Sequence, residues 1–134
     1  MSLSPTVRKL DHVKIVSIKE NHVFRRLYAK GKSAAAPALV LYVRRNGGKE
    51  NRLGLTVSTK VGKAVVRNKV RRRLREIYRL HQHELARGWD LVVVARVKAA
   101  FVSYAALERD FLKLADKLGI RQIPSHGSRR DSPF

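Results

Sequence analysis

The hydrophobic pattern is most regular between residues 58 and 79, where apolar side chains recur at helical spacing. An α-helix turns by about 100° per residue, so positions three and four apart share one face. The repeating apolar positions of this segment are Val66, Val70, Leu74 and Ile77. Residues 59–62 precede the repeat and open the helix. The pattern therefore predicts a helix that buries one narrow stripe and leaves most of its surface to solvent or a partner.

Two segments before this helix are rich in β-forming residues and predict strands. Residues 39–45 form an apolar run, and residues 52–58 alternate between apolar and polar positions. Residues 45–49 contain two adjacent glycines and an asparagine, so the strands are predicted to pair as a hairpin. The apolar face of the second strand carries Leu53, Leu55 and Val57. Its other face carries the small or polar residues that suit the floor of a site for an extended ligand: Arg52, Gly54, Thr56 and Ser58.

Residues 17–30 predict a short helix in front of these strands. Ser17 together with Glu20, or Asn21 alone, is suited to cap its first turn. Gly31 follows the helix and is suited to end it in the left-handed conformation that glycine adopts without strain.

Three aromatic residues belong to these first elements. Phe24 and Tyr28 are four residues apart and share a face of the short helix, and Tyr42 stands on the first strand. Aromatic rings in short helices are often buried. Burial in the core and contact with a ligand therefore both remain open for these rings at this point.

The second half of the chain predicts one strand and one helix. Residues 90–97 are a valine-rich run, which is typical of a central strand covered on both faces. Ser103 is suited to cap the last helix and Gly119 to end it. The buried stripe of that helix is predicted at Leu107, Phe111, Leu114 and Leu118. Elements in this order predict an α+β domain of two layers.

The chain has 134 residues and no long linker, which predicts one domain over residues 1–118. Residues 1–16 mix charges with a proline and are interpreted as a loosely docked arm. Residues 119–134 are basic and contain proline, serine and glycine, which predicts a disordered tail.

The charge balance narrows the class of partner. Thirty Lys and Arg against ten Asp and Glu give a formal net charge of +20, which favours nucleic acid first and an anionic membrane second. A membrane role lacks support, because no apolar run approaches the length of a spanning helix and no signal peptide is recognisable. The absence of cysteine excludes thiolate metal sites and disulfides and fits a cytoplasmic protein.

The predicted helix of residues 58–79 carries much of this charge on one side. Steps of about 100° per residue place six polar side chains on one arc beside the apolar stripe. The arc consists of Arg67, Asn68, Arg71, Arg72, Arg75 and Arg79. Lys69 and Arg73 flank the stripe on its other side. Glu76 is the only acid of the segment, so the repulsion is uncompensated, which favours a polyanion-binding face over an ordinary solvated one.

No arrangement of residues in the sequence predicts catalysis by the protein alone. A two-metal nuclease needs clustered carboxylates, whereas Glu108 and Asp110 are two apart and hence on different helix faces. His81 and His83 have the same spacing, which does not suit a helical metal site, and are interpreted as polar residues at a helix end. No nucleophile motif is present.

Several segments together match one protein family. Residues 53–72 read LGLTVSTKVGKAVVRNKVRR, which closely resembles the signature of the bacterial ribonuclease P protein component. Three further matches stand in the family's order: the spacing of Asn21, Phe24, Tyr28 and Gly31, the run LVLY at 39–42, and the run DLVVVAR at 90–96. The resemblance covers about residues 17–118, and a long match with three collinear supports is specific.

The resemblance implies a small basic subunit that binds a large catalytic RNA and, with it, removes the 5′ leader of precursor tRNA. In that family the RNA performs the cleavage with Mg²⁺, which the RNA mainly holds, so the protein has no catalytic residues and no metal site of its own. The resemblance implies that the following residues face the catalytic RNA: Arg67, Asn68, Lys69, Arg71, Arg72 and Arg75. Lys69 stands where the family motif has arginine, which keeps the charge but loses a bidentate fork.

The resemblance also implies a second surface, a cleft between the sheet and the first helix that holds the single-stranded leader. The matching residues are Phe24, Tyr28 and Tyr42, with Lys60 and Lys63 beside them. Stacking of unpaired bases on such rings tolerates differences in sequence, as leaders require. The fold implied is an αβββαβα sandwich with a mostly antiparallel sheet and a left-handed crossover, against the usual right-handed preference.

Two other functions were weighed against this one. A ribosomal or general RNA-binding protein needs the basic helix but not a second track for a flexible strand. A DNA-binding protein that inserts a helix into a groove does not account for the aromatic face, and no helix-turn-helix pair is predicted.

Overall fold

The computed structural model describes residues 14–122, which form seven regular elements in the order αβββαβα. They are α2 (Asn21–Lys30), β1 (Lys32–Ala35), β2 (Leu39–Arg45), β3 (Arg52–Thr56), α3 (Ala64–His81), β4 (Trp89–Ala95) and α4 (Tyr104–Lys117). Short 3₁₀ turns lie between some of them: η1 (Thr59–Val61), η2 (Gln82–Glu84) and η3 (Val97–Ala100). The predicted α+β class and this order of elements are confirmed.

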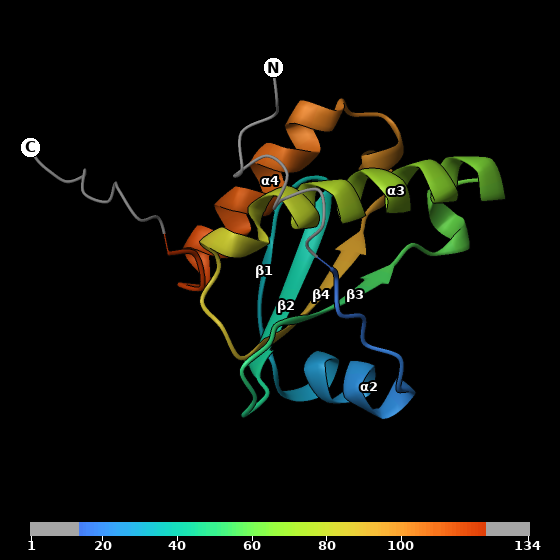
Figure 1. The fold of residues 1–134 in the computed structure, drawn as a ribbon. Helices are drawn as coiled ribbons and strands as arrows, with labels where there is room; N and C mark the ends of the chain where they lie inside the picture. The colour runs from blue at the N-terminus through green and yellow to red at the C-terminus, as the bar shows by residue number, and fades with distance from the viewer. Residues whose placement is uncertain (1–13, 123–134) are drawn as a thin grey trace, which may run out of the picture.

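The four strands form one sheet in the order β1-β2-β4-β3. β2 is antiparallel to both β1 and β4, and β3 is parallel to β4, so the sheet is mostly antiparallel as predicted. α3 connects the two parallel strands and lies with α4 over one face, while α2 lies under the other (Figure 1). The left-handed sense of this crossover stays a prediction.

The predicted hairpin between β2 and β3 is wrong, because β4 lies between them. The valine-rich β4 pairs with β2 over seven residues and with β3 over five, which satisfies its backbone on both sides. The turn at Asn46 bonds to the start of β4 instead: its N–H donates to Gly88 O at 2.8 Å and its Nδ2 to Asp90 Oδ1 at 3.0 Å. Arg52 of β3 completes the junction with two bonds of 2.8 and 2.7 Å to the buried Asp90 carboxylate.

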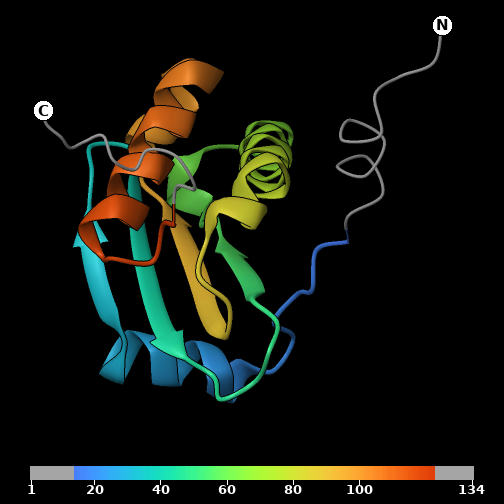
Figure 2. The same cartoon turned by 60° about the vertical axis from the view of Figure 1, so that its left-hand side comes forward.

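The main core lies between the sheet and the pair α3 and α4, which stand side by side in Figure 2. Val70, Leu74 and Ile77 of the predicted α3 stripe are buried, and Val66 packs against them partly exposed. The α4 stripe is buried at Leu107, Phe111 and Leu114, with Leu118 partly exposed. Ser103 Oγ accepts from Ala106 N–H at 3.1 Å, which confirms the predicted cap.

A smaller apolar cluster lies on the opposite face, between α2 and the sheet. Its buried members are Ile18, Val23, Leu27 and Val92. Phe24, Tyr42 and Val94 pack against them and stay partly exposed. Because side chains alternate along strands, this face carries the polar or small side of β3, as predicted.

Both predicted caps of α2 are wrong. The residue before its first turn is Glu20, and no side chain caps it. Gly31 has φ −76° rather than a positive value. A Cβ at this position would lie 2.6 Å from Leu27 O and 2.9 Å from Val43 O, so glycine is required by the close approach of the backbone rather than by its conformation.

The boundaries of the predicted arm and tail need adjustment. Leu53 N–H donates to Val16 O at 2.8 Å, so the last residues of the predicted arm dock on β3. The predicted tail is wrong for residues 119–122, because Ile120 is fully buried and Arg121 bridges to Leu85. Residues 1–13 and 123–134 lie outside the described part of the chain.

Candidate nucleic-acid interface

The outer side of α3 carries an open groove of about 540 Å³. Its lining residues are Ile15, Asn68, Arg71, Arg72, Arg75, Glu76 and Arg79. All but Ile15 come from one side of α3, because positions three and four apart lie above one another on a helix. The groove therefore collects five of the six members of the predicted arc: Asn68, Arg71, Arg72, Arg75 and Arg79.

Glu76 is the single carboxylate among the residues that line this groove, and it forms an ion pair with Arg79 of the same helix. Arg79 donates to both oxygens of Glu76, at 3.2 and 2.7 Å, and this hydrogen bonding lowers the pKa of the Glu76 carboxyl. Within residues 14–122 no ion pair joins an acid to Arg71, Arg72 or Arg75. Arg71 Nη1 donates only to Asn68 Oδ1, at 3.0 Å. The groove thus presents cationic and amide groups to solvent, as a phosphate backbone requires.

The predicted aromatic residues come together on the other face of the sheet. The Tyr28 ring stands edge-on to the Tyr42 ring at 5.0 Å between centroids and lies 6.5 Å from the Phe24 ring. Tyr28 OH and Thr56 Oγ1 are 2.8 Å apart, which ties α2 to the end of β3. Tyr28 is 42% exposed, and Phe24 and Tyr42 are partly buried. None of the three rings is sealed in the core, so part of each ring is open to solvent.

Gly54 is what allows Phe24 to lie against the sheet. A Cβ at residue 54 would approach two ring carbons of Phe24 at 2.6 Å and Val92 Cγ2 at 3.3 Å. The sequence placed Gly54 on the face of small residues but did not pair it with Phe24. A glycine inside a strand was the available signal, because it often marks a close approach.

Comparison with known proteins identifies the family of the chain. The sequence model of the family described as Ribonuclease P matches residues 14–119. The chain belongs to the ribonuclease P protein family. The ribonuclease P protein component of Natranaerobius thermophilus is 41% identical over 108 residues, 81% of this chain and 94% of that protein. The component of Clostridium botulinum strain 657 is 46% identical over 104 residues, 77% of this chain and 94% of that protein.

Solved structures of ribonuclease P proteins share the fold. The RNase P protein of Staphylococcus aureus superposes with a TM-score of 0.74 at 32% identity, covering 81% of this chain and 100% of that one. The RNase P protein of Thermotoga maritima gives a TM-score of 0.70 at 31% identity, covering 75% of this chain and 96% of that one. These values confirm the fold class and the role as a ribonuclease P protein component.

Two residues implied by the ribonuclease P motif lie outside the groove. Arg67 Nε donates to Gly62 O at 3.1 Å, which holds its side chain at the entrance of α3. Lys69 is exposed and two steps of about 100° from Arg67, on the side of α3 that carries Arg73. Arg73 Nη1 in turn donates to Val102 O at 3.2 Å, so that side faces the start of α4.

Lys60 and Lys63 are exposed on the connection between β3 and α3. Ser58 Oγ accepts from Lys60 N–H at 3.3 Å, which starts η1, and Gly62 ends this turn at φ 154°. Both lysines therefore stand beyond the end of β3, where Thr56 meets Tyr28, rather than among the rings. Their predicted contact with a leader stays a prediction.

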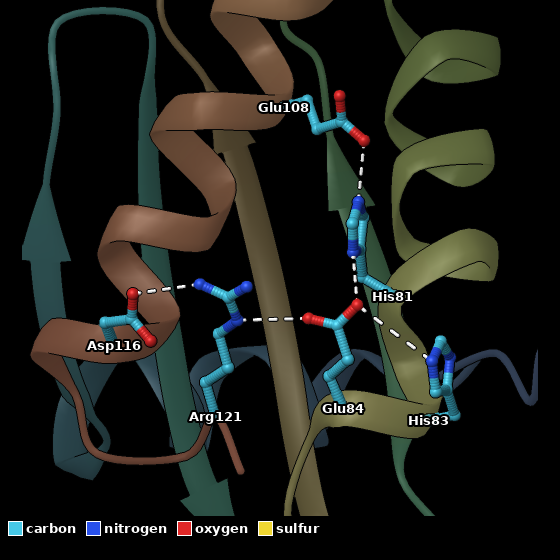
Figure 3. Close-up of polar contacts among 6 residues, drawn as sticks. All are labelled: His81, His83, Glu84, Glu108, Asp116 and Arg121. Atoms are coloured by element: carbon cyan, nitrogen blue, oxygen red, sulfur yellow. Dashed lines mark hydrogen bonds and ion pairs between the residues drawn. The ribbon is translucent and has the colours of Figure 1, made fainter. Parts of the chain in front are cut away.

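The sequence interpretation missed a polar network at the other end of α3 (Figure 3). His81 Nδ1 lies 2.8 Å from Glu84 and its Nε2 lies 2.6 Å from Glu108, so the ring joins η2 to α4. Arg121 pairs with Glu84 at 3.1 Å and with Asp116 at 3.0 Å. Burial by itself would lower the pKa of His81, but the bonds to Glu108 and Glu84 outweigh it and raise that pKa. This network fastens residues 119–122 to the domain.

The carboxylates of the described chain do not form a metal site. Within residues 14–122 no three His, Asp or Glu side chains are placed to hold an ion. Glu84, Glu108 and Asp116 are engaged with His81 and Arg121, and Asp90 with Arg52. The described helices also include none that is long and apolar enough to cross a bilayer.

Proposed function

We propose that this chain is a cytoplasmic RNA-binding subunit that assists a catalytic RNA in removing the 5′ leader of precursor tRNA. The observation that carries the proposal is the cationic groove on α3, in which Arg71, Arg72 and Arg75 lack acidic partners among the described residues. Three such cations on one helix side neutralise several phosphates at once, and the released counterions favour binding.

The aromatic surface supports a second role toward the leader. Phe24, Tyr28 and Tyr42 offer edges and faces on which unpaired bases stack, on the opposite side of the sheet from α3. A general RNA-binding protein is the alternative function, and it gives no reason for this second surface. The two surfaces together suit a protein that holds a structured RNA and a single strand at once.

The position of the acids supports a division of labour between protein and RNA. Mg²⁺ prefers clustered oxygen ligands, and the carboxylates described above are engaged with His81, Arg52 or Arg121 instead. The residues present therefore do not fit a protein magnesium site. We assign Mg²⁺ mainly to the RNA and the positioning of RNA and leader to the protein.

Addition of the protein to a bacterial ribonuclease P RNA tests the proposal. At low Mg²⁺ concentration the protein is expected to increase the rate of leader removal, and the variant Arg71→Gln with Arg72→Gln is expected to lose much of this increase. Lys117→Gln, an exposed α4 residue far along the chain from the groove, is the matched control. An equal rate with and without the protein, or leader removal by the protein without RNA, would contradict the proposal.

A further inference from the structure

A second hollow of about 360 Å³ lies beyond the C-terminal end of α3. Three separate segments line it: the entry segment 14–16, the connection between β2 and β3, and the connection between α3 and β4. The lining residues are Lys14, Val16, Lys49, Glu50, Asn51, Gln82, His83 and Arg87. None of the motifs considered in the sequence covers this set.

The hollow follows the α3 groove, because residues adjacent in the sequence line the two on both sides. Ile15 lines the groove, and its neighbours Lys14 and Val16 line the hollow. Arg79 is the last groove residue on α3, and Gln82 and His83 follow at three and four positions, on the same side. From Asn68 to Gln82 this side extends over about 20 Å, at about 1.5 Å per residue. Such a length accommodates several consecutive phosphates of one nucleic-acid strand.

The charge in the hollow favours an anion. Lys14, Lys49 and Arg87 are exposed cations, and Glu50 is the one carboxylate among the lining residues. The carbonyl end of α3 adds the equivalent of only about half a negative charge, and its effect falls off within one turn. The three cations therefore outweigh the negative charge of Glu50 and of the α3 carbonyl end together. His83 adds a further donor at the rim and lies 4.0 Å from Glu84.

The hollow also contains a polar group without a partner. Gln82 lines it, and Gln82 Nε2 is buried and makes no hydrogen bond within the described chain. A buried amide donor without an acceptor destabilises the structure that contains it. Asn51, its neighbour in the lining, is fully used, since Nδ2 donates to Ala86 O at 2.8 Å and Oδ1 accepts from Trp89 N–H at 2.8 Å.

We propose that this hollow binds a phosphate group of the same RNA strand that follows the α3 groove. Lys14, Lys49 and Arg87 neutralise the phosphate, and Gln82, which also lines the hollow, has an amide donor without a partner in the described chain. The RNA track thus runs past the end of α3 to the β2–β3 connection. This inference rests on the proposed function, because it assigns the ligand of that track.

The salt dependence of RNA binding tests the inference. Lys49→Gln and Arg87→Gln are measured separately against a bacterial ribonuclease P RNA, with Lys117→Gln as control and Arg72→Gln as the groove reference. Loss of one phosphate contact decreases the absolute slope of log K against log salt by about 0.7 to 0.9. We expect this decrease for Lys49→Gln, Arg87→Gln and Arg72→Gln, and no change for Lys117→Gln. Lys49 and Arg87 are exposed, so their substitution should leave the fold intact, and chemical unfolding verifies this for each variant.

The other outcomes separate the two proposals. An unchanged slope for Lys49→Gln and Arg87→Gln, with a decrease for Arg72→Gln, overturns the inference and leaves the proposed function in place. An unchanged slope for all variants overturns the proposed function itself. Thermal stabilisation of the wild-type protein by inorganic phosphate that both hollow variants abolish, with unchanged RNA slopes, identifies a free-anion site and also overturns the assignment to RNA.

Discussion

The two faces of the sheet differ in how completely they are covered. On one face α3 and α4 bury a large cluster that includes Phe111, Tyr78 and Leu91 at 1% exposure or less. On the other face α2 alone covers a small cluster, and Phe24 and Tyr42 remain partly exposed at its margin. Helices on the covered face anchor a rigid basic surface, while the incompletely covered face keeps rings accessible. The fold thus separates a stabilising core from a face whose aromatic rings stay partly exposed.

The largest contrast is expected in stability. Phe111→Ala empties a site that is 1% exposed and packs edge-on against Tyr78 at 6.5 Å, so it should cost about 3–5 kcal/mol. Phe24→Ala removes a partly exposed ring and should cost clearly less. Urea unfolding of both variants measures the difference. Equal losses would show that the α2 face is as much a part of the core as the α4 face.

A second prediction concerns the leader. Phe24→Ala and Tyr42→Ala should each weaken binding of precursor tRNA by about 1–3 kcal/mol, the value of one base stacked on a ring. Binding of mature tRNA should hardly change, because it has no leader. Gly54→Ala sharpens the test, since its methyl group displaces the Phe24 ring without removing it. Filter binding of the holoenzyme measures all three, and equal loss for precursor and mature tRNA would favour a purely structural role.

A third prediction compares arginines on α3. Arg71→Gln and Arg72→Gln should each decrease the absolute slope of log K against log salt for RNA binding by about 0.7 to 0.9, because both side chains line the groove. Arg67→Gln should lower it less, because its Nε is bonded to Gly62 O. Binding titrations at several salt concentrations provide the slopes. A larger effect at Arg67 than at Arg72 would place the RNA at the entrance of α3 instead.

The smallest effect is expected from pH. The pKa of His81 is raised in the folded protein. Its contribution to folding stability is therefore fully present below the unfolded pKa of about 6.5 and is lost as pH rises through the folded pKa. The groups facing the ring are Glu84 on η2 and Glu108 on α4, with Arg121 beside Glu84. The stability difference between wild type and His81→Gln should therefore decrease as pH rises from about 5.5 to about 8.5, roughly one and a half units either side of neutrality. Urea midpoints across this range measure it, and a difference independent of pH would contradict the role of the charged imidazole.

The sequence predicted the elements well where the pattern is local. The α3 and α4 stripes, the Ser103 cap and the central position of β4 followed from periodicity and composition within each segment. β1 was not recognised from its residues, because Lys32–Ala35 is a short, mostly exposed edge strand without apolar alternation. The αβββαβα order came from the family resemblance.

The candidate site was predicted in part. Steps along one helix were enough to group Asn68, Arg71, Arg72 and Arg75, because their relative directions depend only on helical geometry. The same steps put Lys69 on the far side, although the motif suggested that it joins them. The hollow at Lys49 and Arg87 could not be predicted from the sequence, because three segments that are far apart in the chain form it.

The sequence by itself determined the helices, the buried stripes, the basic arc and the class of partner, because each depends on neighbouring residues or on total charge. Only the tertiary structure decided that β4 separates β2 from β3 and that Gly31 and Gly54 are needed for close contacts. It also decided that Glu84 and Glu108 enclose His81. The physical reason is that strand pairing and side-chain packing join residues far apart in the chain, and no local pattern records which distant partner a residue meets.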